Sequence, residues 1–405
     1  MKLPKTHASE MAIISKKKIP FKINGFLRAY LEEYSREVAL PIQYASLLRF
    51  DNAIPLYDKK GSDTLWETVF YSQADIEEIY FALKTIYADL KADGDMSVMK
   101  HLYVDRVDLC SYGNSKPFRI RIVNKVNDNF DYFYVKNADS SRVYGLELEH
   151  LLSPNRISYL TSGDTLIEEH IAGIPGDMFI KSYLQDVNLN PIRLCKEFVK
   201  FNERCFVRLL GDMHSSNFVV DITPDFEEIY YRIRSIDFDQ QCYEGKKGVY
   251  LPQYFKQNKA LIELGFKYLT PESVRQYQTE ERSLIAGRLR VERKRIQELL
   301  SVMAQDTISS PQQTDQLKNE LAHHYHNNTF LDCRSMGEIV RKSLELVMIH
   351  WVFGLFSDPI AWSVGVARTP SDEAAIAWSL FSDAIAWSDG VALLHPRNHG
   401  VFGWT

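Results

Sequence analysis

Two polar motifs joined by a strand, a turn and a second strand constrain this 405-residue chain most. In the first motif, Asp212 stands five residues before Asn217, and an apolar run follows directly. After a turn, a second predicted strand, 231–236, leads directly to Asp237. Two short strands separated by a turn predict that the second strand brings Asp237 back to Asp212 and Asn217.

These three side chains suit phosphoryl transfer. Such a reaction needs a carboxylate that orients or deprotonates the acceptor hydroxyl, and oxygen ligands that hold Mg²⁺ across the phosphates of ATP. Asp212 is our candidate catalytic base. Asn217 and Asp237 are our candidate metal ligands, because Mg²⁺ or Mn²⁺ prefers carboxylate and amide oxygens. We therefore expect an ATP-dependent phosphotransferase.

The segments 210–220 and 233–239 together resemble the catalytic and metal-binding loops of the protein-kinase-like superfamily. The resemblance is closest to aminoglycoside-phosphotransferase-like kinases and to a group of bacterial proteins, the DUF2252 group, with a Gly-Asp-x-His-x-x-Asn-Phe loop and an Asp-Phe-Asp loop. It covers about residues 104–242. It implies the same roles for Asp212, Asn217 and Asp237, and a supporting role for His214. Asp239 stands where protein kinases have glycine, which is a departure from the pattern.

Upstream residues fit the same resemblance. The apolar strand 132–136 ends in Lys136, as kinase-like folds present a cation to the α- and β-phosphates. We expect Glu147 on the following helix to pair with Lys136, with Glu149 as the alternative because helix register is uncertain by a residue or two.

Two backbone segments are expected to contact the nucleotide. The segment 167–173 resembles the linker between kinase lobes, where backbone groups of Glu169, His170 and Ile171 would bind adenine. The turn 111–115 holds one glycine where kinases often have several, and Gly113 and Ser115 are candidate phosphate contacts. An ordinary hairpin turn is the alternative for this segment.

The pattern of elements predicts an α+β, two-lobed kinase-like fold. We expect a helical N-terminal extension over residues 1–100, a small antiparallel-sheet lobe over 101–173 and a helical lobe over 174–354. The remaining residues, 355–405, form a tail in which Leu-Phe-Ser-Asp-x-Ile-Ala-Trp-Ser occurs twice.

Composition narrows the functional classes. A net charge of -5 gives no global case for nucleic-acid binding. The five cysteines are scattered and odd in number, which favours a reducing, cytoplasmic location, and the N-terminus carries no secretory-signal pattern. The most apolar stretch, 346–356, is too short to span a bilayer, so no transmembrane segment is expected.

Two local clusters need separate interpretation. Basic residues gather in one helical stretch, which predicts either a solvated helix face or a contact with a polyanion such as an inositol phosphate or an acidic lipid headgroup; they are Arg288, Arg290, Arg293, Lys294 and Arg295. The histidines at 323, 324 and 326 lack the spacing of helix-borne zinc ligands, so we interpret them as a solvated turn.

Other functions stay open at this stage. The poor glycine turn is consistent with a catalytically inactive nucleotide-binding pseudokinase scaffold, and transfer of the nucleotide instead of the phosphate uses nearly the same residues. A metal-dependent hydrolase would use Asp212, His214, Asp237 and Asp239 as a metal cluster, but leaves Lys136 unexplained. The acceptor is a hydroxyl of a protein or of a small molecule. An Ala-Pro-Glu element is absent after Asp239, which favours the small molecule.

Overall fold

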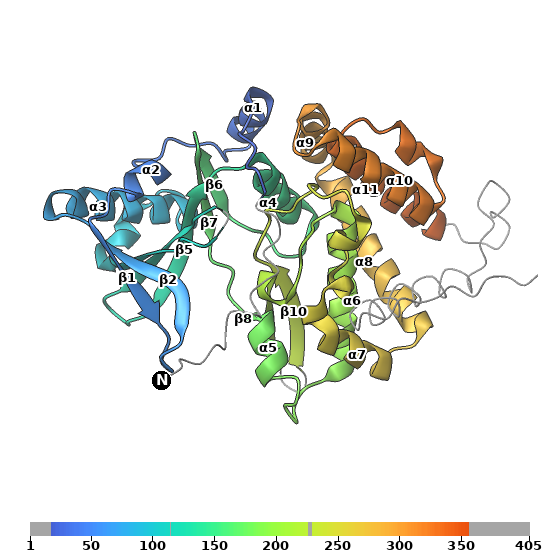
Figure 1. The fold of residues 1–405 in the computed structure, drawn as a ribbon, viewed down its shortest axis with the longest axis horizontal. Helices are drawn as coiled ribbons and strands as arrows, with labels where there is room; N and C mark the ends of the chain where they lie inside the picture. Colours follow the sequence, from blue (N-terminus) through green and yellow to red (C-terminus); the bar gives the residue numbers. More distant parts are fainter. Residues whose placement is uncertain (1–17, 114, 226–228, 356–405) are drawn as a thin grey trace, which may run out of the picture.

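The structure, a computed structural model, describes residues 18–355 except 114 and 226–228. The repeated sequence of the tail lies outside these residues. The described chain forms a sheet lobe followed by a mainly helical lobe, which lie side by side in Figure 1. The predicted α+β, two-lobed class is confirmed.

The sheet lobe is built on seven antiparallel strands in the order β1-β2-β3-β4-β5-β7-β6. Its strands are β1 (Asn52–Tyr57), β2 (Asp63–Phe70), β3 (Leu102–Leu109), β4 (Phe118–Asn124), β5 (Phe130–Asn137), β6 (Tyr159–Ser162) and β7 (Thr165–Glu169). Strand β5 lies between β4 and β7 in the sheet. Lys136, near the end of β5, lies opposite Leu166 of β7.

The expected helical N-terminal extension also contains two strands in its middle part. Helices α1 (Gly25–Glu33), α2 (Tyr44–Leu47) and α3 (Gln73–Lys91) are present, but β1 and β2 form a hairpin that continues the sheet. The polar turn 58–62, with Gly61 at φ +79°, was the available signal. Strand β1 is mostly exposed, so it lacks the alternating burial that marks a strand in sequence.

The helical lobe contains one small sheet of three strands, in the order β10-β9-β8. Its elements are β8 (Ile174–Pro175), α5 (Gly176–Ser182), α6 (Pro191–Arg208), β9 (Phe218–Pro224), β10 (Ile229–Ser235), α7 (Lys259–Tyr268), α8 (Pro271–Val291), α9 (Arg293–Gln305), α10 (Pro311–Tyr325) and α11 (Met336–Leu355). Among the described helices, none is long and apolar enough to cross a membrane.

Helix α4 (Ser140–Leu152) joins the two lobes. Its apolar side chains belong to the core of the helical lobe, together with those of α6, α8 and α9, although the helix directly follows β5. Strand β7 contributes Leu166 to that core and Ile167 to the second core, which α3 forms against the large sheet. All of α4 except His150 is buried, so each charged side chain on it needs a partner inside the protein.

Candidate functional site

The loop that carries Asp212 is fixed by its backbone. Helix α6 ends at Leu209 in the left-handed conformation, with φ +57°. Gly211 then donates its N–H to the Gln240 carbonyl at 3.1 Å, and Asp212 donates its N–H to the Val249 carbonyl at 3.0 Å. A Cβ on Gly211 would lie 2.9 Å from Val249 Cγ1, so the close approach of these segments requires glycine.

Asp212 has the strained backbone and the raised pKa that often mark a functional carboxyl group. Its φ is +61°, which is uncommon for a residue other than glycine. Burial, followed by the negative charges of Asp237 and Glu244, raises its pKa from 3.8 to about 7. A carboxyl group with a pKa near neutrality is suited to exchanging a proton with a hydroxyl.

The β9–β10 hairpin brings the two candidate metal ligands together as the sequence predicts. Ser235 lies opposite Phe218 in the ladder, and one position further the N–H of Ile236 donates to the Asn217 carbonyl at 3.0 Å. Asp237 follows directly. Asn217 donates its side-chain N–H to the Asp212 carbonyl at 2.8 Å, which leaves its amide oxygen for another partner.

An amide oxygen and a carboxylate are donors that suit Mg²⁺ or Mn²⁺. No group of three or more His, Cys, Asp or Glu side chains in the described part of the chain is arranged to hold a metal. This donor set fits a cation that takes its remaining ligands from water and phosphate, as Mg²⁺ commonly does. The hydrolase alternative would need three or more such side chains around one metal, and the described residues do not provide that group.

Lys136 is buried at the end of β5, and its partner is Glu168 of β7. The Lys136 ammonium donates to Glu168 Oε2 at 2.7 Å. Burial, and then repulsion from Arg142, lowers the pKa of Lys136, while Glu168 opposes that change. The cation that we expected is therefore present, held by a carboxylate on a neighbouring strand.

The expected pairing of Lys136 with Glu147 is wrong. Glu147 is fully buried and accepts hydrogen bonds from Tyr30 at 2.8 Å, Tyr159 at 2.6 Å and Arg295 at 2.7 Å. These partners come from α1, β6 and α9, so Glu147 lies on the side of α4 that faces them. The alternative, Glu149, forms an ion pair with Arg208 of α6.

Arg142 is the α4 residue that reaches the candidate site. Its Nη2 donates to Asp237 Oδ1 at 2.5 Å, its Nε donates to Asp239 Oδ1 at 2.6 Å, and its Nη1 donates to Glu168 Oε1 at 3.0 Å. Although burial raises the pKa of Asp239, Arg142 lowers it to about 2. We call Lys136, Arg142, Glu168, Asp237 and Asp239 the Arg142 cluster.

Sequence reasoning missed Arg142 and the role of Glu168. Arg142 lies six residues after Lys136, in the first turn of the helix that follows β5, and a short connection of this kind keeps it beside the end of the strand. Gly145 lets α4 approach the 237–239 loop closely, because a Cβ there would lie 3.0 Å from Phe238 Cβ. A small residue on a buried helix was the only sequence signal for this contact.

Lys18 extends the cluster from the N-terminal side. Its ammonium pairs with Asp139, just before α4, and donates to the Asp239 carbonyl at 2.6 Å. Lys18 is buried. The start of the described chain therefore packs directly against the segment that carries Asp239.

The linker residues are placed between the lobes, but some of their groups are already used. The Glu169 N–H donates to the Ser158 carbonyl at 3.1 Å, and the Glu169 carboxylate pairs with Lys91 at 2.9 Å. His170 packs against the rings of Tyr132 and Tyr134. Ile171 is buried in the core of the helical lobe. Because the Glu169 N–H has a partner, the adenine contact that we expected from the sequence would have to use other backbone groups of the linker.

The turn between β3 and β4 is an ordinary hydrogen-bonded turn. Lys116 donates its N–H to the Gly113 carbonyl at 3.0 Å, and Cys110 donates its N–H to the Pro117 carbonyl at 3.0 Å. Gly113 does not use a left-handed conformation. A phosphate contact by Gly113 or Ser115 stays a prediction.

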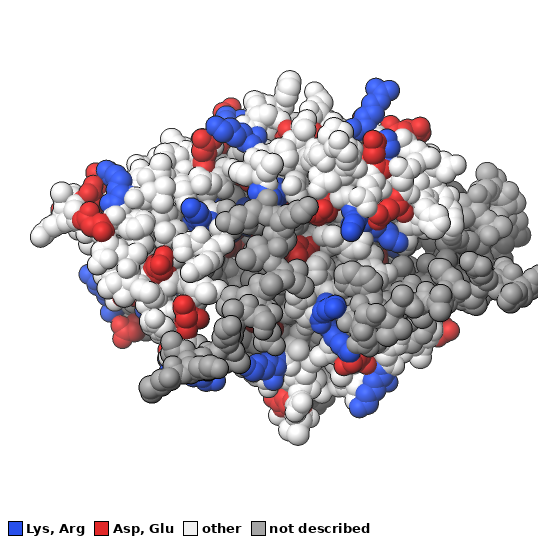
Figure 2. Space-filling view, in the orientation of Figure 1, with Lys and Arg blue, Asp and Glu red and all other residues white. Residues whose placement is uncertain are grey.

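The basic run is divided between two helices. Arg295 forms an ion pair with Glu147, and Lys294 forms one with Glu33 at 3.2 Å. Arg288 donates a hydrogen bond to the Leu152 carbonyl at 3.5 Å. On the face shown in Figure 2, described basic and acidic side chains are interspersed. The polyanion contact stays a prediction, with fewer basic groups available than the sequence suggested.

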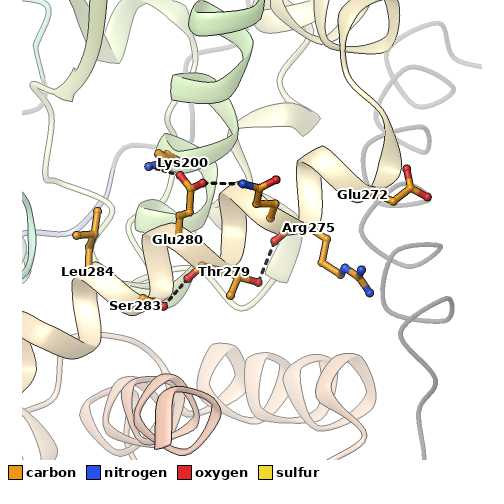
Figure 3. A pocket seen from close by; sticks show the side chains of 8 residues that line it. Lys200, Glu272, Arg275, Thr279, Glu280, Ser283 and Leu284 are labelled. Carbon is orange, nitrogen blue, oxygen red and sulfur yellow. Dashed lines mark hydrogen bonds and ion pairs between the residues drawn. The ribbon is translucent and has the colours of Figure 1, made fainter. Parts of the chain in front are cut away.

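An open surface pocket lies elsewhere, against α8 and Lys200 of α6, with a volume of about 760 Å³ (Figure 3). Its polar groups largely bond one another: Thr279 and Ser283 donate to carbonyls of their own helix, and Glu280 pairs with Lys200 at 3.0 Å. None of the candidate catalytic residues lines it. We therefore place the candidate site in the Asp212 region, whose side chains could exchange a proton and bind a cation.

Comparison with known proteins gives little support for any identity. No protein-family model matches the chain, and no curated protein matches it. Among solved structures, titin kinase with its flanking domains matches with a TM-score of 0.24 and 13% sequence identity, over 82% of this chain. The match spans 63% of that structure's length. A TM-score this low carries no argument about fold or function.

The raised pKa of Asp212 makes a prediction about stability. The folded state retains a proton that the unfolded state releases above about pH 4, so the free energy of unfolding falls as pH rises toward 7 and then levels off. In metal-free protein, we expect the stability of Asp212→Asn relative to wild type to increase between pH 5 and 7, by up to roughly 1.4 kcal/mol per pH unit.

Urea unfolding of both proteins in the presence of a chelator measures this difference. The difference reports the titration of Asp212 and its coupling to Asp237, Glu244 and Asp239, because all other titrating groups are common to both proteins. A constant difference from pH 5 to 8 would show that Asp212 ionises normally.

Proposed function

We propose that the chain is an ATP-dependent phosphotransferase that transfers the γ-phosphate to a hydroxyl group. One observation carries the proposal. The β9–β10 hairpin brings Asp237 beside the loop that carries Asn217 and Asp212, whose pKa is raised to about 7, and Arg142 links Asp237 to the buried Lys136–Glu168 pair. The resemblance of segments 210–220 and 233–239 to kinase-like loops supports the same function.

Each residue has a definite role in this proposal. Bound Mg²⁺–ATP supplies the γ-phosphoryl group and, through the metal, neutralises the charge on the phosphates. Asn217 and Asp237 would hold the metal, and Lys136 would bind the phosphates from the sheet lobe. As the oxygen of the acceptor hydroxyl bonds to the γ-phosphorus, Asp212 accepts the proton of that hydroxyl. The bond from that phosphorus to the β–γ bridging oxygen breaks, and ADP is released.

A second candidate, the inactive nucleotide-binding scaffold, is favoured by one observation. Arg142 forms an ion pair with Asp237. In a scaffold that binds no metal, this pair would balance the charge of Asp237.

Turnover of ATP separates these functions. With Mg²⁺ or Mn²⁺ we expect label to be transferred from γ-labelled ATP and not from α-labelled ATP, and we expect Asp237→Ala to abolish the transfer because it removes a metal ligand. Transfer from the α position would mean nucleotidylation. Nucleotide binding without turnover would favour the scaffold, and absence of binding would contradict the proposal.

The corrected partner of Lys136 gives a matched pair of variants. Glu168→Gln removes the charge that holds Lys136 and Arg142, so we expect ATP affinity to fall roughly tenfold or more. Glu147→Gln leaves Arg295 and Arg36 without a buried charge partner, so we expect a loss of about 3–5 kcal/mol of stability. Its ATP affinity should be unchanged.

Nucleotide binding by calorimetry and chemical unfolding measure the two effects. Loss of ATP affinity in Glu147→Gln at a temperature where it remains folded, with normal affinity in Glu168→Gln, would reverse our assignment of the two glutamates.

A further inference from the structure

The guanidinium of Arg142 is unusually constrained. It directs one nitrogen to each of three carboxylates, on β7 and on the loop after β10. Its side chain is only 4% exposed, and those of Glu168 and Asp239 are 4% and 12% exposed. Asp237 differs, because 32% of its side chain is exposed. Two of the three contacts are therefore buried, and the third faces the solvent-accessible part of the site.

This difference divides the guanidinium into a fixed part and an exchangeable part. Nε and Nη1 are held by buried carboxylates, and breaking those contacts would leave charges buried without partners. Nη2 donates to Asp237 Oδ1, which also accepts from the Asp239 N–H at 3.2 Å, and the Asp237 carboxylate is the most exposed of the three. A cation that binds Asp237 competes with Nη2 and leaves the rest of Arg142 in place.

The charges around Arg142 also favour a bound cation. Lys18, Lys136 and Arg142 contact the carboxylates of Asp139, Glu168, Asp237 and Asp239. These carboxylates outnumber the cations by one, so an added positive charge would be attracted to the cluster.

We propose that Arg142 is a nucleotide-binding residue that occupies Asp237 until a metal ion binds there, and that its Nη2 then donates to a phosphate oxygen of the nucleotide. This inference rests on the proposed function. The planar guanidinium is suited to the second role, since it is always charged and donates to phosphate as readily as to carboxylate. Held by Glu168 and Asp239, Nη2 is already oriented toward the metal ligand, where the phosphates of a metal-bound nucleotide would lie.

The two roles predict opposite effects of one substitution. Arg142→Gln removes the competitor for Asp237, so Mn²⁺ should bind roughly tenfold more tightly in the absence of nucleotide. The same substitution removes a charged donor to phosphate, so ATP with Mg²⁺ should bind roughly tenfold to a hundredfold more weakly. A purely structural arginine would weaken both or neither.

The experiment uses the full chain. Mn²⁺ binding is followed by electron paramagnetic resonance, and ATP binding by calorimetry, in wild type, Arg142→Gln and Arg142→Lys. Lysine keeps the buried positive charge but cannot contact three carboxylates, so it tests the inference if Arg142→Gln fails to fold; we expect weaker ATP binding and tighter Mn²⁺ binding than in wild type. Arg121→Gln, which removes a partly exposed ion pair between Arg121 of β4 and Asp105 of β3, is the matched control and should match wild type.

The outcomes separate this inference from the proposed function. Wild type that binds ATP and Mn²⁺, together with Arg142 variants that bind Mn²⁺ no more tightly or ATP no more weakly, would overturn the inference and leave the function standing. Wild type that binds neither ATP nor Mn²⁺ would overturn both.

Discussion

The arrangement of this protein depends on a buried helix whose charged side chains all require partners. Helix α4 is enclosed between the two lobes, and Arg142, Glu147 and Glu149 each pair in a different direction. Burying an unpaired charge is costly, so each pair fixes the helix against a separate part of the protein. Glu147 fixes it to α1 and α9, Glu149 fixes it to α6, and Arg142 fixes it to β7 and to the loop that carries Asp237.

This constraint explains how residues from both lobes form one site. Strands β5 and β7 bring Lys136 and Glu168 from the sheet lobe, while the β9–β10 hairpin brings Asn217 and Asp237 from the helical lobe. Arg142 contacts Glu168 and Asp237 at once, so the lobes are linked through the very side chains to which we assign nucleotide and metal binding. On our proposal, metal binding would release one of these contacts and retain the others.

Local sequence patterns predicted the two parts of the candidate site that depend on neighbouring segments of the chain. The hairpin that joins Asn217 to Asp237 and the emergence of Lys136 from a buried strand both follow from strands and turns near in sequence. The partners of Lys136 and Glu147 did not follow, because they depend on which side of α4 faces which lobe. A helix buried on every side has no amphipathic pattern from which to infer its orientation. The exposed β1–β2 hairpin was missed for a related reason, since little burial accompanies its strands.

The central claim is that Asn217 and Asp237 form a metal site for a nucleotide beside Arg142. The most direct measurement is anomalous diffraction from crystals grown with Mn²⁺ and a non-hydrolysable ATP analogue. The account predicts a manganese peak bound by the Asn217 amide oxygen and the Asp237 carboxylate, with the analogue's phosphates between Lys136 and Arg142. Manganese absent from these two residues while the analogue is bound, or an analogue bound away from Lys136, would contradict it.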